Sequence, residues 1–228
     1  MFEIPDFWGW LTSPENWEGR YGIPSLLAEH LILTLAAIFA AGLIAVPLGI
    51  VIGHFNRGTA LVVLLGSASR AVPTMGLLFA LVMLLGVQQR ELAVVIALVA
   101  IAFSPILAGS YAGIGAIEKH IPDAAKAQGL TTWQLLRIVE IPLALPAIIG
   151  GLRVAWIQVV STVVLAPLVG LSGLGFGIIQ GLALRNFDQV VASALMIVVV
   201  TVLGDQLLGF AQKTQAFRLG HLSGGKTK

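Results

Sequence analysis

The chain has 228 residues, of which 57% are hydrophobic and only 11% are charged, and its mean hydropathy is +0.96. Soluble domains are about 45–50% apolar and about 25% charged, so this composition excludes a single soluble core and predicts an all-α integral membrane protein that uses the lipid bilayer as its solvent. The small net charge of +2 comes from scattered basic residues and indicates no nucleic-acid surface, and the absence of cysteine excludes disulfides and thiolate metal sites.

Residues 1–25 are expected to form an extracytoplasmic, interfacial segment. The stretch contains several acidic residues and lacks a basic region followed by an apolar core, so it is not a signal peptide. Trp8, Trp10 and Trp17 stand among the acidic residues. Tryptophan prefers the membrane–water interface, which favours a segment lying on the membrane over the alternative of a disordered tail.

The transmembrane domain is expected to cover residues 26–211, because a spanning helix needs about 20 apolar residues. The stretches that meet this requirement are 26–53, 59–87, 92–116, 142–165 and 189–211. The segment 166–185 is apolar but rich in glycine, and we expect it to form a re-entrant or surface hairpin protected by protein. About five spans are therefore predicted, with six as the alternative, and residues 212–228 are expected to form a cytoplasmic tail.

The orientation follows from the distribution of Lys and Arg, which favour the cytoplasmic side. If the polar loop 118–141 lies inside, only Arg20, Arg90 and Arg185 lie outside. The basic residues placed inside are Arg57, Lys119, Lys126, Arg137, Lys213, Arg218, Lys226 and Lys228. The bias predicts an N-terminus outside and a C-terminus inside the cell.

The loop 118–141 is expected to contain two short helices. Pro122 suits a first helical turn, Asp123 complements the positive end of the helix dipole there, and Gly129 is typical of a C-terminal cap. The alanines between them leave the first helix with small side chains, so that another surface can approach its backbone closely. An ordinary amphipathic loop is the alternative interpretation.

A second helix is predicted after the first. Thr131 and Gln134 have the spacing of a capping box, and Pro142 is expected to end this helix. The whole loop resembles the EAA motif of the permease subunits of ATP-binding-cassette (ABC) importers, in which Glu-Ala-Ala is followed by three residues, Gly, nine residues and Ile-x-Leu-Pro. The matching residues are Asp123, Ala124, Ala125, Gly129, Val139, Ile141 and Pro142.

This resemblance implies the type I ABC importer permease fold, with the loop as a coupling helix docked on a separate ABC ATPase subunit. Residues 25–215 are also similar to the permeases for glycine betaine, choline and carnitine. The segments that carry this similarity are 29–31, 72–77, 105–107, 111–114, 165–170 and 173–175. Pro167, Leu171 and Ser172 depart from the family pattern, and Arg70 stands where a neutral polar residue is expected.

The resemblance further implies import of a quaternary ammonium osmoprotectant across the bacterial cytoplasmic membrane. Another small solute, such as an amino acid, is the alternative, and a secondary transporter is a more distant one because no coupling-ion site or internal repeat is evident. The implied partners are the ATPase, a second permease subunit that is identical or homologous, and an extracytoplasmic substrate-binding protein.

The chain itself is expected to be no enzyme and to hold no cofactor or metal, with ATP and Mg²⁺ bound by the ATPase. The segment Gly220-x-x-x-x-Gly225-Lys226-Thr227 matches the P-loop pattern. A P-loop needs a strand before it and a helix after it, and the chain ends one residue after Thr227, so we reject nucleotide binding. The four histidines are scattered and none has a second ligand at metal-binding spacing.

Charged residues within the predicted spans are candidates for a translocation path or gate. Arg70, Arg153 and Asp205 fall at such positions, where a charge costs at least about 2.5–3.5 kcal/mol near the bilayer centre. We expect Asp205 to pair with Arg70 or Arg153, with a snorkelling Arg70 as the alternative. The other candidates for the path or gate are Pro73, Thr74, Ser104, Tyr111, Trp156, Ser161 and Thr162. Helix packing, or a static kink at Pro73, is the alternative role.

Three Gly-x-x-x-Gly pairs begin at Gly49, Gly109 and Gly177. Glycines four residues apart lie on one face of a helix and allow a neighbouring helix to approach closely. We interpret the three pairs as packing contacts within the bundle, with a contact between permease subunits as a further possibility.

Overall fold

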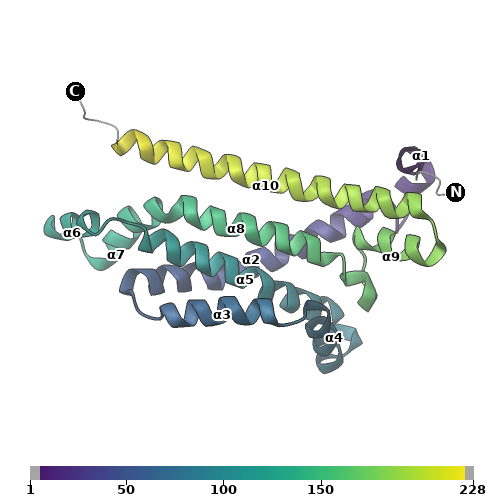
Figure 1. Cartoon of the computed structure of the whole chain (residues 1–228), viewed down its shortest axis with the longest axis horizontal. Helices are drawn as coiled ribbons and strands as arrows, with labels where there is room; N and C mark the ends of the chain where they lie inside the picture. The colour runs from purple at the N-terminus through teal and green to yellow at the C-terminus, as the bar shows by residue number, and fades with distance from the viewer. Residues whose placement is uncertain (1–5, 224–228) are drawn as a thin grey trace. The chain divides into compact units, whose positions relative to one another are not determined.

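The structure is a computed structural model that describes residues 6–223, apart from the side chains of residues 61, 69, 70 and 218–223 (Figure 1). Within the described range every regular element is a helix, which confirms the predicted all-α class. The elements are α1 (Phe7–Thr12), η1 (Pro14–Trp17), α2 (Ile23–Phe55), α3 (Thr59–Ala71), α4 (Thr74–Leu85), η2 (Val87–Gln89), α5 (Arg90–Gly115), α6 (His120–Ala127), α7 (Thr132–Leu135), the π-helix η3 (Leu136–Glu140), α8 (Ile141–Val163), η4 (Ala166–Val169), α9 (Gly175–Leu184) and α10 (Phe187–Ser223).

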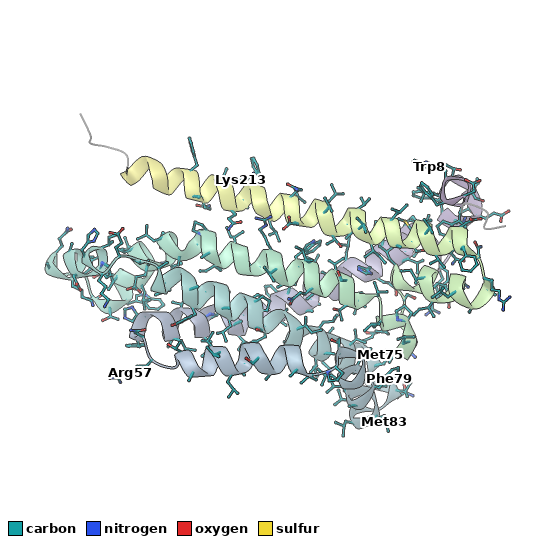
Figure 2. The ribbon with its side chains drawn as sticks, in the orientation of Figure 1. Trp8, Arg57, Met75, Phe79, Met83 and Lys213 are labelled. Carbon is teal, nitrogen blue, oxygen red and sulfur yellow. The ribbon has the colours of Figure 1, made fainter. Side chains whose placement is uncertain are left out.

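Four helical segments of the described chain are long and apolar enough to cross a membrane. They are Ile23–Phe55, Val87–Gly115, Thr132–Val163 and Phe187–Phe217. Each overlaps one predicted span. Large apolar side chains remain exposed along the helices, as Met75, Phe79 and Met83 do on α4 (Figure 2). Such a surface is stable when lipid covers it, as the composition predicts.

The remaining predicted span, 59–87, is not one helix. It is divided into α3 and α4, of 13 and 12 residues, at Pro73, which has no backbone N–H to continue a helix and itself adopts an extended conformation with φ −63° and ψ 115°. Pro73 then caps α4, and its carbonyl accepts a hydrogen bond from the Leu77 N–H at 2.9 Å. At about 1.5 Å per residue, neither helix alone matches the thickness of the hydrocarbon core.

The described parts of both chain ends contain helices. Residues 6–22 contain α1 and η1, and the Asp6 carboxylate caps α1 by accepting a hydrogen bond from the Gly9 N–H at 2.9 Å. Trp8 is 63% exposed (Figure 2), as suits an interfacial side chain. At the other end, α10 extends into the predicted tail as far as Ser223. Gly220 therefore lies within a helix and does not follow a strand, while residues 224–227 of the P-loop-like pattern lie outside the described residues.

The chain divides into two compact units, each made of segments that are distant in sequence. The first unit contains residues 1–39, 72–100 and 156–203, and the second contains 40–71, 101–155 and 204–228. In the first unit, the Tyr21 ring stacks on Phe176 with centroids 4.4 Å apart. Buried His30 Nε2 lies 3.1 Å from the Val160 carbonyl oxygen. These contacts fix the start of α2 against α8 and α9 in that unit.

The second unit is organised around close approaches to α5. A Cβ atom placed on Gly49 of α2 would lie 2.6 Å from Ser110 Cβ of α5. A Cβ atom placed on Gly109 of α5 would lie 2.8 Å from the Ala147 carbonyl oxygen and from Gly151 Cα of α8. Real Cβ atoms do not tolerate these distances, so α5 lies between α2 and α8 only because these positions are glycine. The packing interpretation of these glycine pairs is confirmed.

The glycine pair of α9 has the same role in the first unit. A Cβ atom on Gly181 would lie 2.7 Å from Val190 Cγ2 of α10, and a Cβ atom on Gly177 would collide with Ser193 Oγ. The segment 166–185, expected to be too broken for a full span, consists of η4 and the ten-residue helix α9. The helix α9 thus lies in close contact with α10 at these two glycines.

Candidate functional site

The first helix of the loop, α6, ends in a Schellman motif. The Leu130 N–H donates to the Ala125 carbonyl at 3.3 Å, and the Gly129 N–H donates to the Lys126 carbonyl at 2.9 Å. Gly129 has a φ of +87°, a left-handed conformation that glycine adopts without strain. Asp123 lies in the first turn of α6. The predicted start and cap of this helix are therefore confirmed, and the cap needs no contact from elsewhere.

The second helix begins with the predicted capping box. The Gln134 N–H donates to Thr131 Oγ1 at 3.4 Å, and the Thr131 N–H donates to Gln134 Oε1 at 2.9 Å. Leu135 is fully buried, whereas Trp133 is 69% exposed. One face of this short helix therefore anchors the loop, while the opposite face remains open.

The expectation that Pro142 ends the second helix is wrong. After α7 the chain forms the π-helix Leu136–Glu140 and continues directly into α8. The Ile141 N–H donates to the Leu136 carbonyl, five residues back. The wider π turn precedes Pro142 in the first turn of α8, so the missing N–H of the proline does not interrupt the helix.

The two halves of the loop enclose a hollow of about 750 Å³. Ala124, Ala125, Gly129 and Val139 of the predicted motif line it, whereas Ile141 and Pro142 are half-buried at the start of α8. A Cβ atom on Gly129 would have no atom within 4 Å. The complete lining is His120, Ile121, Ala124, Ala125, Gln128, Gly129, Leu130, Gln134, Ile138 and Val139. The loop thus presents small and apolar groups on a concave surface that a ridge of another protein can enter.

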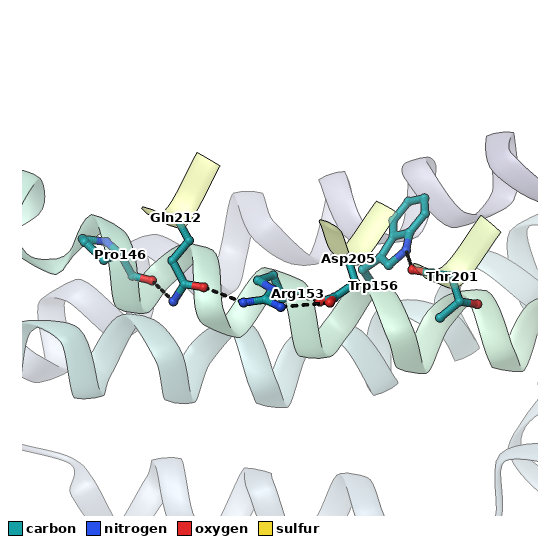
Figure 3. A network of polar contacts seen from close by, with 6 residues as sticks. All are labelled: Pro146, Arg153, Trp156, Thr201, Asp205 and Gln212. Carbon is teal, nitrogen blue, oxygen red and sulfur yellow. Dashed lines mark hydrogen bonds and ion pairs between the residues drawn. The ribbon is translucent and has the colours of Figure 1, made fainter. Parts of the chain in front are cut away.

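A polar network joins α8 and α10 in the second unit (Figure 3). Arg153 Nε and Nη2 donate to the two carboxylate oxygens of Asp205 at 2.8 and 2.9 Å, and Arg153 Nη1 donates to Gln212 Oε1 at 2.8 Å. Gln212 Nε2 in turn donates to the Pro146 carbonyl at 2.9 Å. The predicted pairing of Asp205 is confirmed with Arg153; the Arg70 side chain lies outside the described residues.

Trp156, a candidate for the solute path, is only 9% exposed in the first unit, and its indole N–H donates to the Thr201 carbonyl at 3.0 Å (Figure 3). The ring face is therefore covered by protein in this structure. The hydroxyls of Ser161 and Thr162 donate to the carbonyls of Ile157 and Gln158, one turn earlier in α8. Their oxygen lone pairs remain available as acceptors.

The other path candidates fall into different parts of the chain. Pro73 is exposed and Thr74 half-buried at the break between α3 and α4, in the first unit. In the second unit Ser104 is half-buried, and the Tyr111 hydroxyl lies 3.0 Å from Thr59 Oγ1. The candidate path residues are therefore divided between the two units, and neither unit contains all of them.

Sequence reasoning missed one contact altogether. His54 Nδ1 lies 2.7 Å from Glu140 Oε2 in the second unit, with both side chains less than 10% exposed. The sequence separation of 86 residues hides this pair. The available signals were a histidine at the end of a span and a carboxylate at the variable position of the Ile-x-Leu-Pro part of the motif.

Comparisons with known proteins agree with the geometry. The family described as "Binding-protein-dependent transport system inner membrane component" matches residues 45–220. The carnitine transport permease protein OpuCD of Listeria monocytogenes serotype 1/2a (strain 10403S) is 31% identical over 82% of this chain and 83% of its own length. The glycine betaine/carnitine/choline transport system permease protein OpuCB of Bacillus subtilis (strain 168) is 30% identical over 81% of this chain and 84% of its own.

Two further matches extend the comparison. The osmoprotectant import permease protein OsmW of Salmonella typhimurium (strain LT2) is 31% identical over 82% of this chain and 88% of its own. Among solved structures, an inward-facing MetNI methionine ABC transporter aligns with a TM-score of 0.63 at 20% identity, covering 79% of this chain and 91% of that chain. At this identity the structural match supports the fold alone.

Proposed function

The chain belongs to the family of inner membrane components of binding-protein-dependent transport systems, the permeases of ABC importers, and we propose that it moves a quaternary ammonium osmoprotectant into the cell. The observation that carries the solute class is the identity of about 30% over four fifths of the chain with permeases named for carnitine, choline and glycine betaine. The methionine transporter is similar only in fold, so it does not favour an amino acid.

The loop 118–141 is the proposed docking surface for the ATPase. Three features support this assignment: the helix α6 carries small side chains, its C-terminal end is capped within the loop, and the concave surface beside it is open. A self-capped helix keeps its shape when a partner pushes on it. In the proposed transporter, ATP and Mg²⁺ bind to the ATPase, which supplies the catalytic groups for hydrolysis.

Two permease chains side by side complete the proposed transporter. Only four helical segments among the described residues are long enough to cross the bilayer, which is few for enclosing a gated solute path. Closure of the ATPase pair on ATP would move both loops, and the helices would follow as rigid bodies. The size of the shift is limited by the difference in ATP affinity between the two states.

The proposed orientation has the N-terminus outside and the loop inside the bacterial cytoplasmic membrane. The excess of Lys and Arg on the loop side and the C-terminal side supports it. An extracytoplasmic binding protein would then deliver the solute to the side that carries residues 1–25.

Reconstitution tests the proposal. Proteoliposomes that hold the permease, its ATPase and the binding protein should take up labelled glycine betaine, choline or carnitine only when ATP is supplied to the ATPase side. Unlabelled competitors identify the solute, with methionine as the negative control. Uptake without ATP, or competition by methionine and not by any betaine, would contradict the proposal.

A further inference from the structure

Two side chains from distant parts of the sequence meet where α2 ends in the second unit. His54 Nδ1 lies 2.7 Å from Glu140 Oε2, close enough for an imidazole N–H to donate to the carboxylate. His54 belongs to the last turn of α2, and Glu140 is the last residue of the π-helix between the loop and α8. The contact therefore connects the candidate coupling loop directly to the first long helix.

The contact adjoins an apolar cluster formed by the same elements. Ile50 lies one turn before His54, and Ala144 lies one turn after Glu140. The buried members of the cluster are Ile50, Ile114, Ala144 and Ile148, with Val46, Ile117, Leu136 and Ile141 packed against them. We call His54, Glu140 and this cluster the α2–loop joint. Apolar contacts are non-directional, so they specify the register between the helices less strictly than a hydrogen bond does.

The His54–Glu140 contact, unlike the apolar contacts, depends on direction. A hydrogen bond needs a defined distance and angle, so it fixes the register between the end of α2 and the start of α8. Glu140 is the last residue of the π-helix, and it is buried although Ile138, two residues earlier, is 63% exposed. Residues two apart in a helix point to nearly opposite faces, so Glu140 lies on the inward face and Ile138 on the outward face.

The loop contains a second pair of the same chemistry, which provides a comparison. His120 Nδ1 lies 3.2 Å from Glu118 Oε2, but these side chains are 73% and 75% exposed and belong to one local turn. Exposed pairs contribute little, whereas removing one partner of a buried pair leaves the other without its hydrogen bond. Only the buried pair joins two elements.

We propose that His54 and Glu140 are positioning residues that transmit the movement of the coupling loop to α2. The inference rests on the proposed function, because it requires an ATPase that moves the loop. When the loop shifts, the hydrogen-bonded pair carries the end of α2 with it. Without the pair, the loop moves while α2 slides within the apolar cluster, and ATP is hydrolysed without a matching transport step.

The test measures uptake and ATP hydrolysis together, in the complete transporter reconstituted in proteoliposomes. For His54→Ala we expect the number of solute molecules taken up per ATP to fall at least about fivefold, the lower end of typical coupling effects between sites. Glu140→Gln retains an oxygen that can accept from the imidazole and should keep more of the ratio than His54→Ala. The matched control Val51→Ala, at a 48% exposed position of α2, should leave the ratio unchanged.

A double variant keeps the proposal testable if His54→Ala fails to assemble. The chain has no cysteine of its own, so His54→Cys together with Glu140→Cys can be bridged selectively by a short bifunctional thiol reagent. Bridging should raise uptake per ATP above that of the unbridged double variant. An unchanged ratio after bridging, or a parallel fall of hydrolysis and uptake in His54→Ala, would overturn the proposal.

If the proposed function itself were wrong, the unaltered protein would show no ATP-dependent uptake. A wild-type transporter that couples uptake to ATP, combined with an unaffected ratio in His54→Ala, would reject only the positioning role.

Discussion

Small residues occur at the surface of α5 and on the loop 118–141, where they allow another surface to come close to the backbone. For α5 that surface is a helix of the same chain, whereas the loop leaves small residues exposed. Along α5, Gly109 touches the backbone of α8 so closely that no Cβ fits. On the loop, Gly129 has no atom within 4 Å of its Cβ position, and Ala124 is exposed. The small residue of α5 is already packed against another helix of the same chain. The small residues of the loop are open to a partner, which is the physical basis for the proposed assignment of the loop.

The largest effect is expected from a large side chain at the close contact between α5 and α8. Gly109→Leu should destabilise the permease by about 3 kcal/mol, the upper end of overpacking costs, because even the Cβ has no room. The unfolding midpoint of the purified protein in detergent measures the effect. Gly42→Leu is the matched control, since a Cβ atom on Gly42 of α2 meets nothing within 4 Å. Equal midpoints for the two variants would contradict the packing account.

A large side chain on the exposed face of α6 should affect ATPase binding and not stability. Ala124→Trp should leave the unfolding midpoint almost unchanged but weaken ATPase binding by about 2 kcal/mol, roughly thirtyfold, as blocking an interface hot spot does. Affinity measurements with the purified ATPase check this. Ala127→Trp, on the same helix but outside the lining of the hollow, should have a smaller effect. Stronger binding loss at position 127 than at position 124 would contradict the assigned docking face.

A third substitution sharpens the comparison with a polar contact inside the chain. Asp205→Asn retains the shape of the side chain but removes the charge that Arg153 contacts with two nitrogens. We expect the unfolding midpoint to fall by a few degrees and uptake to fall less than in Ala124→Trp. The exchange Arg153→Asp with Asp205→Arg should recover part of the midpoint. No change in Asp205→Asn would indicate that the network contributes nothing to stability.

The smallest effect is expected at the cap of the loop. Thr131→Ala removes the side-chain acceptor of the capping box and should cost about 1 kcal/mol of local stability. Faster amide exchange in residues 132–140 would report this loss. Thr132→Ala is the neighbouring control, and its amide exchange rates should equal those of the unaltered protein. Identical exchange in both variants would show that the cap does not hold the loop.

Local patterns predicted most of the elements. Apolar length located the four long helices within a few residues, apart from the C-terminal extension of α10, and the glycine, threonine and glutamine signals of the loop located its caps. The division at Pro73 and the continuation through Pro142 show why one proline rule is insufficient. Pro73 stands where a regular α-helix would need its N–H, whereas the π turn before Pro142 accommodates the missing donor.

Contacts between distant segments were harder to predict. The charge in the spans indicated that Asp205 needs a cationic partner, but only the packing of α8 on α10 selects Arg153. The contact between His54 and Glu140 joins residues 86 positions apart in the sequence, and no local pattern indicated it. Long-range register of this kind requires the packed structure.

In the proposed transporter, another protein covers the open surface of α6. The most direct test of this contact attaches a photoreactive maleimide to Ala124→Cys in this cysteine-free chain, within membranes that contain the ATPase. Met83→Cys on α4, 85% exposed and apolar, serves as the reference position (Figure 2). The account predicts a covalent permease–ATPase product from position 124 and none from position 83. Absence of that product from position 124, or an equal yield from both positions, would contradict it.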